Sequence, residues 1–390
     1  MKIGILTLPL HTNYGGILQA YALQTVLERM GHEVEIIKWE KKIFTGFPFY
    51  KRPFIYAKRL LKHEELYREY REQQESCIVY EHLQESIDRM IHFSTQMIHN
   101  KMMLVEYCNK TQFDAIVVGS DQVWRKSYET KSFFEKFLPS NKFPNLDTYF
   151  LDFVSLLDRR PQLLAYAASF GVEYEELDKS EVEHYGNLAK RFDIISVREQ
   201  QAVNMIQNAY KWREDISWVL DPTMLLSADD YKCLYSQAAI KPEKPYLLYY
   251  VLDSTLEKTS LMHLLARELS LNVISVSPNS QSGNIRERVL PSVETWLSYF
   301  LTADFVLTDS FHGMVFSILF KKPFYVMGNK KRGLARFTSL LEMLGLEDRL
   351  ILNLSESVKL ERNIDWNHVS RVLSDYRHKC VSILPNKSKE

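Results

Sequence analysis

The chain has 390 residues, which is too many for one ordinary hydrophobic core and predicts two domains. Its 46% hydrophobic and 25% charged residues are typical of a soluble globular protein, and its formal net charge of zero argues against a nucleic-acid partner. The four cysteines lack metal-ligand spacing and no apolar run has the length of a membrane span, so we expect reduced thiols, no metal site and a cytoplasmic protein.

The first half of the chain alternates predicted strands and helices, a pattern typical of parallel sheets. Residues 3–8 form an apolar run that is too short for a signal peptide and is therefore predicted to be the first strand, followed by a helix over residues 17–30. Further strands are predicted at residues 34–39, 115–118, 163–168, 194–197 and 218–220. Together they predict an N-terminal Rossmann-like domain over residues 1–230.

Residues 41–112 interrupt this alternation and are predicted to be a helical insertion, with long, highly charged helices over residues 62–110. Residues 41–62 contain seven Lys or Arg residues, no acidic residue and six aromatic residues. Basic and aromatic side chains together are typical of a peripheral contact with the inner face of a membrane. The alternative is a surface excursion whose aromatic side chains pack on the core.

A second series of strands follows a polar linker near residues 226–244. These strands are predicted at residues 246–252, 273–276, 305–308 and 323–327, and a helix at residues 334–344. The pattern predicts a second Rossmann-like domain over residues 240–365. A final helix over residues 366–385 is a candidate to pack back on the first domain.

The most informative polar turn follows the strand at residues 305–308 and contains Ser310 and His312. Open α/β sheets bind ligands at the carboxyl ends of their strands, and the amino ends of helices favour anions. We therefore interpret His312 as a catalytic residue that faces an anionic substrate. The alternative is a histidine with a structural hydrogen bond.

Other predicted turns carry further candidates. Ser120 and Asp121 follow the strand at residues 115–118, where Asp121 is either a base or a helix cap. Arg198 ends the strand at residues 194–197 and is either an anion ligand or part of a surface ion pair. Two further groups are weaker candidates for binding phosphate: Asn13, Gly15 and Gly16 in the first loop, and Arg332 and Arg336 in the basic segment at residues 330–336.

Several ordered segments together resemble the polysaccharide pyruvyl transferase family. They are Asn13-Tyr14-Gly15-Gly16 with Gln19-Ala20, Phe113-Asp114 to Trp124, Ala165 to Gly171, Ser196-Val197-Arg198-Glu199, Leu220-Asp221-Pro222-Thr223, and Thr308 to Gly313. Each segment alone is weak evidence, whereas their order and spacing across the chain are specific.

The resemblance implies two doubly wound domains of the GT-B type with the active site in the cleft between them. It implies phosphoenolpyruvate as co-substrate without a resident cofactor. The acceptor is a pair of sugar hydroxyls, on a lipid-linked oligosaccharide or a polysaccharide, and the product is a pyruvate ketal of surface or capsular polysaccharide. His312 matches the catalytic histidine of the family, Arg198 a donor-binding arginine, and Asp121 an acidic residue near the acceptor.

The chain departs from the family pattern at Ser310, because family members carry an arginine two residues before the histidine. Arg332 or Arg336 is our candidate to compensate for that missing charge. Two other functions stay open at this point. One is a nucleotide-sugar glycosyltransferase of the same fold, and the other is a non-catalytic relative.

Overall fold

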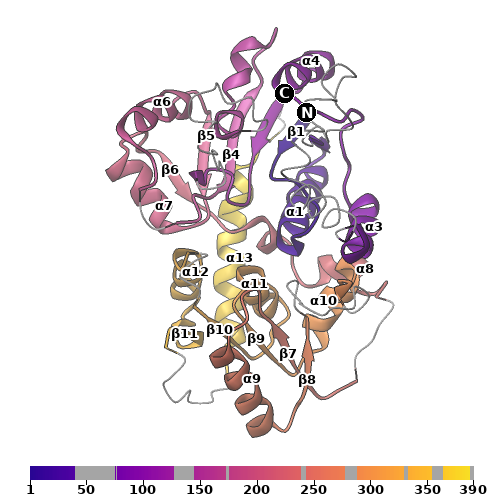
Figure 1. The fold of residues 1–390 in the computed structure, drawn as a ribbon. Coiled ribbons are helices and arrows are strands. Elements are labelled where there is room, and N and C mark those ends of the chain that lie inside the picture. Colours follow the sequence, from indigo (N-terminus) through magenta and orange to yellow (C-terminus); the bar gives the residue numbers. More distant parts are fainter. Residues whose placement is uncertain are drawn as a thin grey trace, which may run out of the picture.

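The computed structural model describes residues 1–39, 75, 77–126, 145–172, 175–238, 243–276, 288–328, 333–353 and 363–386. These residues form two lobes, each built on a parallel sheet with helices packed against it (Figure 1). The predicted α/β fold class is therefore confirmed. The basic and aromatic segment at residues 41–62 lies outside the described residues, as does Arg332.

In the described part of the N-terminal lobe, six parallel strands lie in the order β2-β1-β3-β4-β5-β6. They are β1 (Lys2–Leu6), β2 (Glu33–Ile36), β3 (Ala115–Val118), β4 (Gln162–Ala168), β5 (Ile194–Val197) and β6 (Ile216–Trp218). The helices are α1 (Tyr14–Arg29), α3 (Glu81–Met90), α4 (Lys101–Thr111), α5 (Leu146–Tyr149), α6 (Lys179–Ala189) and α7 (Gln200–Asn204). All of β3 is buried, as expected for a central strand covered on both faces.

In the described part of the C-terminal lobe, five parallel strands lie in the order β11-β10-β9-β7-β8. They are β7 (Tyr246–Tyr250), β8 (Asn272–Ser275), β9 (Phe305–Thr308), β10 (Phe324–Met327) and β11 (Leu350–Ile351). The helices are α8 (Lys232–Tyr235), α9 (Leu256–Leu269), α10 (Val293–Thr302), α11 (Phe311–Leu319), α12 (Ala335–Leu344) and α13 (Trp366–Ile383).

The two sheets share one connection pattern. In each, the first strand has the second strand on one side and the third strand on the other, so successive connections leave in opposite directions beside the first strand. Such a topological switch point leaves a crevice at the carboxyl ends of the two strands, and open α/β sheets bind their ligands there. The N-terminal switch point lies between β1 and β3, and the C-terminal one between β7 and β9.

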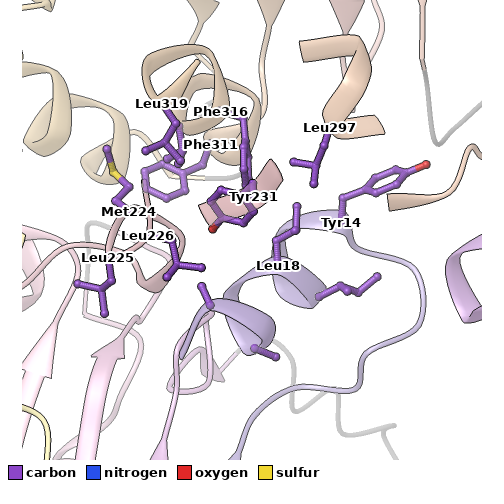
Figure 2. Close-up of a cluster of buried hydrophobic side chains, with 14 of the residues drawn as sticks. Tyr14, Leu18, Met224, Leu225, Leu226, Tyr231, Leu297, Phe311, Phe316 and Leu319 are labelled. Carbon is purple, nitrogen blue, oxygen red and sulfur yellow. The ribbon is translucent and has the colours of Figure 1, made fainter. Parts of the chain in front are cut away.

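An apolar seam joins the lobes (Figure 2). Tyr14 of α1 stacks on Trp296 of α10, with ring centroids 5.1 Å apart, and donates a 2.6 Å hydrogen bond from its hydroxyl to the carbonyl of Pro291. Tyr231 packs edge-on against Phe316 of α11 at 5.1 Å. Each large side chain buried in this way contributes about 1.5–3 kcal/mol, so the seam holds the lobes together like part of a core.

Helix α13 also connects the lobes and runs from the lower lobe to the upper one in Figure 1. It packs against α12 in the C-terminal lobe. Farther along, Arg377 donates to the carbonyl of Met224 at 2.6 Å, and the thiol sulfur of Cys380 accepts from the backbone N–H of Leu220 at 3.2 Å. The last described residues reach the turn between α1 and β2, because His32 donates to the carbonyl of Pro385 at 2.7 Å.

Two local predictions are wrong. The strand expected at residues 218–220 is β6, Ile216–Trp218, because the chain leaves the sheet before Asp221, whose side chain caps the turn at Pro222. Long helices do not fill the described part of residues 62–110. Helices α3 and α4 are separated by an extended segment in which Phe93 and Ile98 form parallel bridges to the first domain's sheet edge, and Asn100 then caps α4.

A buried ion pair shapes the loop after β7. The ammonium of Lys258 lies 2.6 Å from the carboxylate of Asp309, and both side chains are buried. Asp309 also accepts from the backbone N–H groups of Leu252 at 2.6 Å and Asp253 at 3.2 Å. The loop that follows β7 is thereby fixed to the loop that follows β9.

Replacing Lys258 with methionine leaves Asp309 charged and buried, so we expect Lys258→Met to lower the free energy of unfolding by about 3 kcal/mol. Urea denaturation at neutral pH measures this change. Lys110→Met, on an exposed position of α4, is the matched control and should be close to neutral. Equal stability of the two variants would contradict a structural role for the pair.

Candidate active site

A pocket of about 270 Å³ lies where the two topological switch points face each other. Its wall comes from the loops after β1, β3, β7 and β9, together with one residue ahead of α3 and one in α12. The lining residues are Thr12, Asn13, Tyr80, Asp121, Gln122, Arg125, Tyr250, Leu252, Asp309, Ser310, Phe311, His312 and Arg336. Both lobes therefore contribute the strand ends at which open α/β sheets bind ligands.

His312 is the second residue of α11 and is held from both lobes. The preceding turn is fixed because Ser310 caps the helix, its hydroxyl accepting from the N–H of Gly313 at 3.3 Å. The imidazole lies against α1 of the other lobe, where a Cβ added to Gly15 would be only 1.9 Å from Nδ1. Its Nε2 lies 3.7 Å from a carboxylate oxygen of Asp221, close enough for charge attraction.

Asp221 is a buried carboxylate at which several elements meet. Its Oδ2 accepts from the Gln19 side chain of α1 at 2.5 Å and from the Arg198 guanidinium at 3.1 Å. Its Oδ1 accepts from the N–H and the hydroxyl of Thr223, at 3.1 and 2.7 Å. Burial alone would raise the pKa of Asp221, but the neighbouring His312 and Arg198, with the Thr223 hydrogen bond, hold it well below its ordinary value.

Arg198 is enclosed by carboxylates. Its side chain has no exposed area, and it lies 3.1 Å from Asp221, 3.4 Å from Asp121 and 3.7 Å from Glu199. Burial would lower the pKa of this guanidinium, but the three carboxylates raise it instead. Burial raises the pKa of Glu199, whose carboxylate accepts from the Ser169 hydroxyl at 2.7 Å. Arg198 thus acts as an internal counter-ion and is not part of the pocket wall.

The structure brings together five of the residues predicted for the site: His312, Asp121, Ser310, Asn13 and Arg336 all line the pocket. Asn13 and Ser310 also cap α1 and α11. Arg198 and Gly15 lie behind the wall, next to residues that line it. Gly16 and Ser120 are not among the lining residues.

Sequence reasoning missed several residues of this region, among them Arg125, Asp221 and Tyr80. Arg125 lines the pocket one residue beyond the Gly119–Trp124 stretch, and nothing in the sequence distinguishes it from the neighbouring Lys126. The sequence does contain a signal for Asp221, because an acidic residue that follows an apolar run and precedes a proline is a strong helix cap. Tyr80 had none, because its place depends on how α3 packs.

The described ranges also bear on metal binding and on membrane spans. Those residues contain no group of three or more His, Cys, Asp or Glu side chains arranged to hold a metal ion. None of the described helices combines the length and the apolar character needed to cross a membrane.

Comparison with known proteins assigns the chain to a family. The family model for polysaccharide pyruvyl transferases matches residues 13–331, which include every predicted site residue except Arg336 and Arg332. The chain belongs to the polysaccharide pyruvyl transferase family. Membership indicates a transferase that moves a pyruvyl group in polysaccharide biosynthesis, with a sugar or polysaccharide as acceptor. No curated protein matches this pyruvyl transferase in sequence.

Solved structures share its architecture. The UDP-N-acetylglucosamine 2-epimerase of Rickettsia bellii aligns with a TM-score of 0.50 and 10% identity over 98% of this chain and 95% of its own. The UDP-GlcNAc 2-epimerase of Methanocaldococcus jannaschii aligns at 0.47 and 11% over 96% and 100%, and a spinosyn rhamnosyltransferase at 0.39 and 12% over 97% and 94%. At such low identity the Rickettsia bellii likeness concerns the fold alone, and this fold of two parallel sheets is of the GT-B type.

The contact between Gly15 and His312 gives a testable prediction. Gly15→Ala should push the His312 ring out of place and lower the free energy of unfolding by about 1–3 kcal/mol, since a methyl group would overpack the seam. Histidine ring resonances in NMR spectra and urea denaturation measure the two effects. Gly16→Ala is the matched control, because its Cβ would meet nothing closer than 3.6 Å. Identical behaviour of the two variants would contradict this packing.

The charge on Asp221 predicts a pH dependence of stability. Because the pKa of Asp221 is depressed in the folded chain, its ionised form stabilises the fold above the ordinary Asp value near 3.9, and this stabilisation is lost as the pH falls toward the folded pKa. We expect Asp221→Asn to cost about 3 kcal/mol near neutral pH. Its deficit relative to the parent chain should shrink as the pH falls from about 5 to about 3.

Urea denaturation at several pH values checks this dependence. Asp88→Asn, at an exposed position of α3, is the control and should show almost no deficit at any pH. A deficit for Asp221→Asn that stays constant over that pH range would show that the carboxylate does not carry the effect.

Proposed function

We propose that the chain transfers the pyruvyl group of phosphoenolpyruvate to a pair of sugar hydroxyls and so forms a cyclic pyruvate ketal in surface or capsular polysaccharide. The observation that carries this proposal is the position of His312. It lines a pocket between the lobes that Asp121 and Arg336 line as well. An acid, a base and a cation are the groups that this reaction needs.

The reaction begins with a proton. The methylene carbon of phosphoenolpyruvate accepts a proton from His312, which leaves an oxocarbenium-like centre at the neighbouring carbon. One sugar hydroxyl attacks that carbon and loses its proton to Asp121. The bond between carbon and phosphate oxygen then breaks, and phosphate leaves with the electron pair. The second hydroxyl closes the ketal and gives its proton to the neutral imidazole of His312, which restores the acid, while the proton on Asp121 passes to the departing phosphate. One phosphate is produced for each ketal.

The charges in the pocket favour this sequence of events. Arg336 is buried, and its guanidinium lies 5.3 Å from the centre of the Phe311 ring. Arg198 acts one layer deeper, through the carboxylate of Asp121 that it holds. Arg336 would therefore attract the donor anion to the pocket that contains His312, while Arg198 keeps the base in place.

The donor decides between the alternatives. Incubation with phosphoenolpyruvate and a panel of lipid-linked and nucleotide-linked sugars should release phosphate and increase the mass of one acceptor. The panel also tells whether the acceptor is lipid-linked, as expected for an enzyme at the cytoplasmic face of a membrane. Binding of a nucleoside diphosphate without any binding of phosphoenolpyruvate would instead identify a glycosyltransferase. Binding of neither ligand would leave a non-catalytic relative.

The role of His312 has its own test. His312→Gln and His312→Ala should each lower turnover about a hundredfold or more, the usual loss for a missing general acid, while donor binding persists. Phosphate release under saturating donor measures turnover. His263→Gln, on an exposed position of α9, is the control and should keep full activity. Near-normal turnover in either His312 variant would exclude it as the acid.

A further inference from the structure

We propose that Arg125 is the second donor-binding cation of this pocket, so that the donor anion is held between guanidinium groups of opposite lobes. The inference deepens the proposed function and rests on it. Arg125 follows β3 in the N-terminal lobe, and Arg336 belongs to the first turn of α12 in the C-terminal lobe. Both line the pocket that contains His312.

The balance of charge in the pocket wall leads to this inference. Fully ionised phosphoenolpyruvate carries three negative charges on its carboxylate and phosphate. Two acidic side chains line the pocket, but each is held by a cation outside the wall: Lys258 lies 2.6 Å from Asp309, and Arg198 lies 3.4 Å from Asp121. Two guanidinium groups, those of Arg125 and Arg336, line the same wall as His312. Guanidinium is also the side-chain group best suited to carboxylate and phosphate.

The surroundings of Arg125 hold it in place for a ligand. Its NH1 donates a 2.9 Å hydrogen bond to the side-chain oxygen of Gln122. Gln122 is itself buried and packs closely on Gly171, where an added Cβ would lie 2.5 Å from the amide carbon. Arg125 is half-buried, so a donor would meet a guanidinium whose position is already set.

The other charged candidates are less suitable. The Arg198 side chain has no exposed area and would have to leave its carboxylate partners to reach a ligand. Ser310 is uncharged, and its hydroxyl accepts from the N–H of Gly313. Lys126, next in sequence to Arg125, forms an ion pair with Glu181 and is absent from the pocket wall. Lys126 therefore provides a matched control of the same charge.

Calorimetric titration with phosphoenolpyruvate tests the inference on the full chain. Arg125→Gln should weaken binding about tenfold to a hundredfold, the range for one lost hydrogen-bonded charge pair. Arg125→Lys should show a smaller loss because it keeps the charge without the two-pronged geometry. Lys126→Gln should bind as tightly as the parent chain. Circular dichroism confirms that each variant is folded.

The outcomes separate the inference from the function on which it rests. If the parent chain does not bind phosphoenolpyruvate, the proposed function fails and the inference fails with it. If the parent chain binds phosphoenolpyruvate and the folded variants Arg125→Gln and Arg125→Lys bind it as tightly as the parent does, the donor assignment stands and the role of Arg125 is overturned. A similar loss of affinity in Lys126→Gln would also overturn that role, because the loss would then reflect the total charge near the pocket and not a contact made by Arg125.

Discussion

The whole arrangement depends on one buried carboxylate, that of Asp221. It fixes Gln19 of α1 and Arg198 at the end of β5, and it faces His312 across the boundary between the lobes. Without this negative charge the Arg198 guanidinium would stay buried beside Asp121 and Glu199 but would lose its ion pair with Asp221. Removing one member of a buried charged group leaves the others uncompensated, which costs far more than the loss of an exposed pair. The Asp221 carboxylate thus has two roles: it stabilises the contact between the lobes, and it orients Arg198 and His312 next to the pocket.

The repetition of one strand order explains why such a contact arises between the lobes. In both sheets the switch point lies beside the first strand, and in both it supplies the loops that line the pocket. The apolar seam of Figure 2 then holds the two switch points toward each other. The catalytic candidate comes from one lobe and much of its support from the other, so neither lobe contains a complete site.

Local features of the structure could be predicted from the sequence, and long-range ones could not. The strands β3, β5 and β9 are short, mostly apolar runs that are followed by a glycine or a polar residue. The first and last residues of all three strands are therefore predicted correctly. The turn that presents His312 is equally local. By contrast, the exclusion of Arg198 from the pocket wall depends on Asp121 and Asp221, which lie far from it in the sequence and join the adjacent Glu199, and no local pattern records that they converge. The wall position of Arg125 likewise depends on Gln122 packing on Gly171.

Two buried arginines differ in their access to the pocket. The guanidinium groups of Arg198 and Arg336 both lie against the Phe311 ring, at 5.5 and 5.3 Å from its centre. Only Arg336 belongs to the pocket wall, whereas Arg198 is sealed among acids. A ligand anion could reach Arg198 only by displacing a carboxylate that is already desolvated and hydrogen-bonded, so the exchange would gain little. The inner arginine therefore keeps the acidic residues in position, and under the proposed function the donor would be bound by the arginines of the pocket wall, Arg125 and Arg336.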